Sequence, residues 1–399
     1  MKKLTSRELL AELQRRTGTK RADTLYDWTE AKNMPSYMRD FFPKYVEYME
    51  ETAKDLPTDY QEVWSYALLK TIFREIQEVT ANAKIRGERI EKLPPIPVFG
   101  TVSMGDFSAQ IVCPIAGDYL IVFSEGLFGF ANLFSKVIAD CFVPEKTDDR
   151  WNMFSVDFAK IEKRMEETPE IQRHFDDLLL AYMVEGHPHA ARQYYPSEAL
   201  AGMQSILCDG MERFIAAHEY SHLVLGHLAD TGRKFREITP DNGAVPSESA
   251  EIREVFYQWR DEMQADMLAM DITMQIMLRK GYDKALSFMG IQAAMLGMEL
   301  LDRMQNLKKG KDPLQPAVCA THPSTEMRKQ LLQEKAREID ESILDLVKVQ
   351  ENIVDFLWKN FMRFYRALED SLREGTESVF DVPFWITQEV IYRRNQEKK

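Results

Sequence analysis

The chain has 399 residues, of which 45% are hydrophobic and 29% charged, as is ordinary for a globular protein. Its formal net charge of −13 disfavours a nucleic-acid partner, which would call for a basic face, and it also disfavours attachment to anionic lipid. No apolar stretch reaches the ~20 residues that a membrane helix needs, the first residues lack the apolar core of a signal peptide, and the four cysteines form no C-x-x-C pair, so the sequence predicts a cytoplasmic protein.

Residues 1–94 are predicted to be helical, up to the helix-breaking stretch Leu93-Pro-Pro-Ile-Pro97. Three short segments rich in β-branched and aromatic residues follow at 98–103, 107–113 and 119–123, and they predict a three-stranded antiparallel sheet. An edge strand of this sheet could pair with an extended peptide, although a sheet that only packs against helices fits the pattern equally well.

The segment 144–210 is predicted to be mainly helical. Within it, His187-Pro-His189 is interpreted as a loop rather than a metal site, because a proline separates the two histidines and no cysteine or acidic residue lies nearby.

The pattern His218-Glu219-x-x-His222 lies inside an apolar run, which predicts a buried helix over residues 214–228. Histidines four residues apart share one face of a helix, so their imidazoles can bind one zinc ion together. Glu219 lies where its carboxylate can reach a water on that metal. The alternative is a pair of core histidines and a glutamate that are satisfied by hydrogen bonds.

A zinc site also needs a third protein ligand, and three candidates compete for that place. His227 is nearest in sequence, but on a continuous helix it would point about 140° away from His222, which favours a structural role. Asp241 and Glu248 belong to a predicted loop at 231–249, which could gate access to the site or simply connect two helices.

Glu262 is the best of the candidates because it lies on a rigid helix, predicted over residues 250–280 and ended by Gly281. Asp266 follows one turn later on the same face. Its carboxylate can accept a hydrogen bond from a zinc-binding histidine and so fix the tautomer of that histidine.

The order of His218-Glu-x-x-His222, Glu262-x-x-Ala-Asp266 and Thr321-His322-Pro323-Ser324 resembles the gluzincin metallopeptidases, and within them the group of the HtpX-like and CAAX prenyl proteases. The resemblance covers about residues 97–330. That group shares a further histidine, here His227, and a sheet ahead of the metal helix. The chain departs from it at Ser221, where glycine is usual, and in having no transmembrane helix.

The resemblance implies one Zn²⁺ per chain, and it implies a role for each matching residue. The ligands would be His218, His222 and Glu262, with Asp266 behind them. Glu219 would be the general base for attack by zinc-activated water on a peptide bond. His322 would be a second oxyanion donor, although a structural hydrogen bond at a helix start also explains it. The substrate-aligning strand would comprise Tyr119, Leu120, Ile121, Val122 and Phe123.

The predicted fold is therefore α+β and mainly α, with a gluzincin-like metallopeptidase core and a small antiparallel sheet at 95–330, an insertion at about 131–210, and helical regions at 1–94 and 331–399. The expected function is that of a zinc-dependent peptidase, in the first place an endopeptidase, acting on a protein or peptide, with no nucleic acid and no membrane span. A gluzincin-fold binding or regulatory protein with an unused site is the alternative. No Gly-x-Met-Glu-Asn stretch supports an aminopeptidase, and the sequence carries no indication of oligomeric state.

Overall fold

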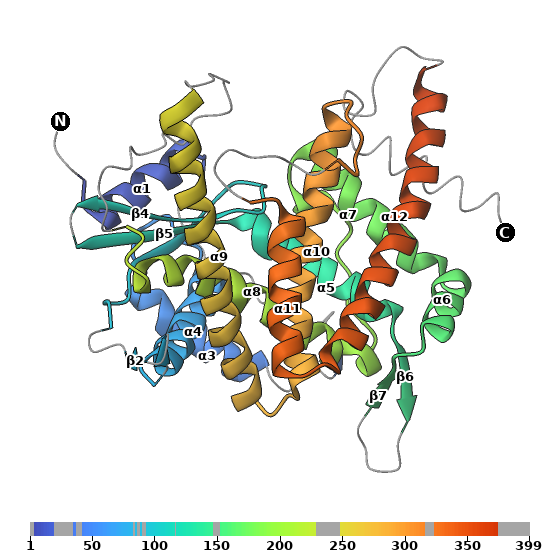
Figure 1. Ribbon diagram of the computed structural model, residues 1–399, viewed down its shortest axis with the longest axis horizontal. Coiled ribbons are helices and arrows are strands. Elements are labelled where there is room, and N and C mark those ends of the chain that lie inside the picture. Colours follow the sequence, from blue (N-terminus) through green and yellow to red (C-terminus); the bar gives the residue numbers. More distant parts are fainter. Residues whose placement is uncertain are drawn as a thin grey trace.

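The computed structural model describes residues 4–19, 35–36, 42–82, 84–85, 88–89, 93–115, 117–146, 152–228, 248–315 and 323–373. Of these residues 71% are helical, and the rest include a small sheet (Figure 1). The predicted fold class, α+β and mainly α, is therefore confirmed. None of the described helices combines the length and the low charge that crossing a bilayer requires. The elements in chain order are α1 (Ser6–Arg16), α3 (Phe42–Thr52), η2 (Ala53–Asp55), α4 (Val63–Thr80), β1 (Lys84–Ile85), β2 (Glu88–Arg89), β3 (Val98–Val102), β4 (Ala109–Ile115), β5 (Asp118–Ser124), α5 (Glu125–Cys141), β6 (Val143–Lys146), β7 (Asn152–Ser155), α6 (Phe158–Glu167), α7 (Pro169–Glu185), η3 (Pro188–Ala190), α8 (Glu198–Val224), α9 (Glu248–Arg279), α10 (Lys284–Lys308), α11 (Thr325–Ile339) and α12 (Ile343–Arg373).

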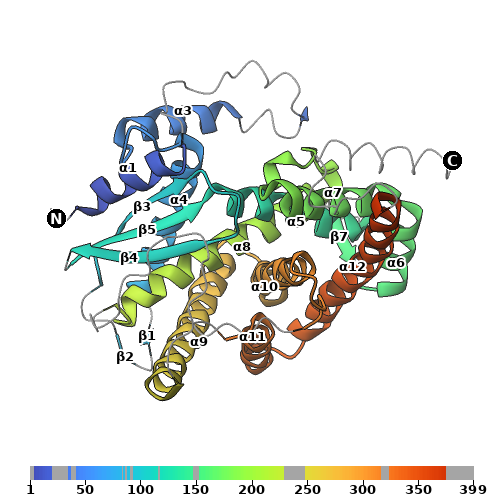
Figure 2. The same ribbon diagram turned by 90° about the horizontal axis from the view of Figure 1, so that it is seen from above.

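The main sheet has the strand order β3-β5-β4, with β3 parallel and β4 antiparallel to β5, so the prediction of an antiparallel sheet is wrong for β3. The reason is the apolar character of β5 on both faces. Leu120 and Val122 pack with Leu10 of α1, which covers one face of the sheet (Figure 2). Ile121 and Phe123 belong to the main core on the other face. A strand that is buried on both faces is most stable in the centre of a sheet.

The helix α8 lies at the centre of the molecule and contacts α4, α5, α9, α10 and β4 (Figures 1 and 2). Its residues from Gly210 to Leu223 are buried without a break, which explains why the sequence there has no polar face. The crossing with α10 is closest at two glycines, where a Cβ atom on Gly290 would lie 2.5 Å from the Cα atom of Gly210. Only glycine at both positions allows this approach.

The helix predicted over residues 250–280 is confirmed as α9, and Gly281 follows it with a φ of 92°. Two further helices, α11 and α12, follow the site. Asp340 ends α11 in an extended conformation, and its side chain accepts from both the backbone N–H and the hydroxyl of Ser342, so the chain turns there.

A carboxyl group is buried on α8 two turns before the predicted metal ligands. Burial is the main cause that raises the pKa of Glu212 from 4.5 to about 8, and the negative charge of Asp209 is the second cause. The thiol of Cys208 donates to Glu212 Oε1 at 3.5 Å. The folded protein therefore keeps a proton that the unfolded chain loses at lower pH.

We expect Glu212→Gln to make the stability less dependent on pH. Since the pKa of Glu212 is raised in the folded state, its contribution to stability falls as the pH rises from about 4.5 to about 8, by up to about 1.4 kcal/mol per pH unit. Urea unfolding of wild type and variant at several pH values between these limits measures the difference. Equal pH dependence of the two free energies of unfolding would contradict the assignment.

Candidate metal centre

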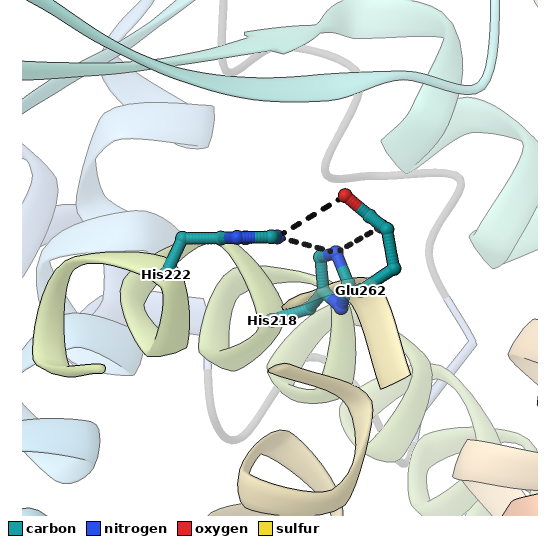
Figure 3. A group of neighbouring side chains, drawn as sticks. All are labelled: His218, His222 and Glu262. Carbon is teal, nitrogen blue, oxygen red and sulfur yellow. Dashed lines mark hydrogen bonds and ion pairs between the residues drawn. The ribbon is translucent and has the colours of Figure 1, made fainter. Parts of the chain in front are cut away.

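The side chains of His218 and His222 on α8 meet the side chain of Glu262 on α9, which lies 44 positions after His218 in the sequence (Figure 3). His218 Nε2 lies 3.2 Å from His222 Nε2. The Glu262 carboxylate faces both rings, with Oε2 at 3.4 Å from His218 Nε2 and Oε1 at 3.5 Å from His222 Nε2. Among the residues that the structure describes, no other group of three such side chains could hold a metal ion.

The separation of the two histidine nitrogens fits a tetrahedral zinc ion. Zinc bonds of 2.0–2.1 Å to nitrogen and oxygen put neighbouring ligand atoms about 3.3 Å apart at the corners of a tetrahedron. The two nitrogens lie within a few tenths of an ångström of this separation, and each of them lies at a similar distance from a different oxygen of Glu262. Three corners are thus supplied by protein, and the fourth is left for water or substrate, as in catalytic rather than structural zinc sites.

His218 is held from behind by a chain of buried charges. Its Nδ1 atom lies 2.8 Å from Asp266 Oδ1, and Asp266 has no solvent exposure. Arg328 on α11 binds both oxygens of Asp266 through Nε and Nη2, each at 2.7 Å. This bidentate pair fixes the carboxylate, which in turn fixes the ring so that Nε2 faces the metal position.

The electrostatics of the site favour one positive charge between the two rings. Burial lowers the pKa of His218, but the hydrogen bonds to Asp266 and Glu262 outweigh it and raise the pKa to about 10. Burial and the neighbouring His218 lower the pKa of His222 to about 3. Burial alone would raise the pKa of Asp266, but Arg328 and His218 lower it to about 2. A cation at the metal position would benefit from the same carboxylates.

Glu219, the predicted general base, lies on the side of α8 that faces the sheet. Its Oε2 atom accepts a hydrogen bond of 2.8 Å from the backbone N–H of Ile111 in β4. The side chain is buried like its histidine neighbours, with 9% exposure against 8% for each of them. The carboxylate is therefore held against an edge strand, and Figure 3 shows the sheet passing over the three ligands.

The strand predicted to align a substrate, from Tyr119 to Phe123, cannot do so. It lies in β5, whose backbone is paired with β3 on one side and β4 on the other. Its apolar faces place it in the centre, as described above, and the strand beside the metal position is β4. Sequence reasoning selected the most hydrophobic segment, whereas edge strands more often carry charged residues or a proline, as β4 does at Pro114.

The remaining predictions fall on different parts of the chain. His227 contacts His222 but is not one of the three grouped ligands. His322 and Asp241 lie outside the described residues, and for Glu248 the structure gives only its place at the start of α9. His187 and His189 form part of the short turn at η3, with the backbone N–H of His189 donating to His187 Nδ1.

Two contacts at the site were missed. Arg328 could have been found, because a buried Asp266 requires a cationic partner and Arg328 lies in a helix shortly after the His322 motif. The N–H of Ile111 could not, since every residue except proline has one.

No family model, no curated protein and no solved structure matches the chain. The class is therefore defined by fold and site alone: a mainly helical protein with a buried candidate metal centre of two histidines and one glutamate.

Proposed function

We propose that this protein is a zinc-dependent peptidase of the gluzincin type, with His218, His222 and Glu262 as the metal ligands. The observation that carries the proposal is the grouping of two histidine nitrogens and one carboxylate close enough to share a metal ion, with Glu219 next to His218 on the same buried helix. A zinc ion bound there would supply Lewis-acid polarisation of a water and of a substrate carbonyl.

The side chains around this position have separate tasks in the proposed reaction. Glu219 takes a proton from the attacking water and delivers it to the departing amine. The N–H of Ile111 holds that carboxylate in place, so its orientation does not depend on solvent. Arg328 and Asp266 keep the ring of His218 aligned through the reaction.

The edge of β4 supports an extended peptide as the substrate. Among the described strands, β4 has one partner, β5, so its other edge can pair with a peptide at positions other than the N–H of Ile111, which donates to Glu219. A peptide paired there crosses the metal position and can continue in both directions, which favours an endopeptidase. The cytoplasmic location stays a prediction from the sequence.

Zinc content tests the ligand set directly. Wild type purified with zinc and then dialysed is expected to hold about one zinc per chain, and Glu262→Ala clearly less, because a lost ligand weakens metal binding. Elemental analysis against protein concentration gives the ratio. Asp271→Ala is the matched control, since it removes an exposed carboxylate from the same helix, where it pairs with Lys335.

Each result has a separate meaning. Equal zinc in wild type and Glu262→Ala would show that the third ligand is misassigned. No zinc in wild type, even after metal is supplied, would overturn the peptidase proposal and favour a binding or regulatory protein with an unused site.

A further inference from the structure

Both proposed ligand histidines need a partner behind the ring. A neutral imidazole that binds a metal through Nε2 carries its proton on Nδ1, and the group that accepts this proton fixes the tautomer and the ring angle. For His218 that acceptor is Asp266. For His222 the corresponding position is filled by another histidine, His227, whose Nδ1 lies 3.0 Å from His222 Nδ1.

The end of α8 explains how His227 reaches this position. Gly226 adopts a left-handed conformation with a φ of 74°, and its N–H donates to the carbonyl of Leu223 at 3.2 Å. The N–H of His227 donates to the carbonyl of His222 at 3.0 Å. This pair of bonds is a Schellman motif, which turns the chain back over the last helical turn. The estimate of 140° assumed a continuous helix, and it fails because α8 ends at Val224.

The protons on this contact can be assigned from the geometry. The Nε2 atom of His222 faces His218 and Glu262, so with a metal bound there the proton of His222 lies on Nδ1 and is donated to His227 Nδ1. His227 then carries its own proton on Nε2, on the side where Asp261 Oδ1 lies at 3.7 Å. Asp261 is buried and immediately precedes Glu262 on α9.

We propose that His227, with Asp261 beside it, is the positioning residue that holds His222 in its metal-binding tautomer. This inference rests on the proposed metal centre. It gives the two ligand histidines separate supports, Arg328 and Asp266 for one and Asp261 and His227 for the other. Each support includes one acidic residue of α9, Asp266 for His218 and Asp261 for His222, and both lie close to Glu262 in the sequence.

Two substitutions at His227 separate hydrogen bonding from packing. The side-chain oxygen of asparagine can take the place of Nδ1 as the acceptor, whereas leucine fills a similar volume and accepts nothing. We expect His227→Leu to weaken zinc binding by about 10–100-fold, as loss of such a partner typically does, and His227→Asn to stay close to wild type. Competition with a chromophoric zinc chelator measures both affinities. If packing were the role, leucine would bind zinc normally and asparagine would not, which would overturn the proposal.

A second measurement needs no variant that could misfold. The chain has seven histidines, so selective ¹⁵N labelling of the zinc-loaded wild type gives few ring signals. His222 is expected to show a proton on Nδ1 and a metal-shifted Nε2. A His222 ring with the metal on Nδ1 would overturn the proposal while leaving the metal centre intact. Wild type that binds no zinc would instead overturn the metal centre, and the inference with it.

Discussion

Glu219→Gln is expected to reduce the hydrolysis of an unfolded protein such as casein by about 10²–10⁴-fold while leaving the zinc content unchanged. Glutamine has nearly the same shape and can still accept the hydrogen bond from the N–H of Ile111, so the fold around it should be kept. It cannot take a proton at neutral pH, and the attacking water would lose its base. Cleavage rates with and without a zinc chelator, together with zinc per chain, measure both effects.

Glu212→Gln is the matched control for this experiment. It makes the same substitution on the same helix, at a buried carboxyl group that is not one of the grouped ligands. We expect it to cleave at the wild-type rate. Full activity in Glu219→Gln would contradict the proposed mechanism, and equal loss in both variants would point to a general disturbance of α8.

Arg328→Met is expected to lower the free energy of unfolding by about 3–5 kcal/mol, because it leaves the Asp266 carboxylate buried without its bidentate partner. Zinc binding should weaken as well, since the ring of His218 is oriented through Asp266. Chemical denaturation of the metal-free and zinc-loaded protein measures the first effect, and chelator competition measures the second.

The control for this prediction lies on the same helix. Arg337 pairs with Glu334 at the surface, where an ion pair contributes about 1 kcal/mol or less, so Arg337→Met should change stability little. A similar, small loss in both variants would contradict a structural role for the buried pair.

The helical parts of the site were accessible from the sequence because helix geometry is local. Spacing of four residues put His218 and His222 on one face, and the same spacing put Asp266 behind Glu262 on a helix whose extent and ending glycine were visible. The meeting of α8 and α9 was inferred from the needs of zinc coordination, which require a third ligand, rather than from any local pattern.

The features of the fold and site that the sequence did not predict depend on long-range packing or on the residue at which a helix ends. The order of strands in the sheet depends on burial of both faces of β5, and one of these faces packs against α1 across more than a hundred residues of sequence. His227 was assigned to the wrong direction because α8 ends at Val224, before the left-handed Gly226, whereas the apolar pattern predicted a helix up to residue 228. The partner of Asp266 likewise comes from a helix 62 residues further along the chain.

The glycine contact between α8 and α10 limits how the site can open. Where Gly210 and Gly290 meet, the two backbones touch without intervening side chains, so neither helix can rotate or slide past the other without a collision. The metal helix and the helices attached to α10 must then move as one rigid body. Any opening of the site must therefore leave this crossing unchanged.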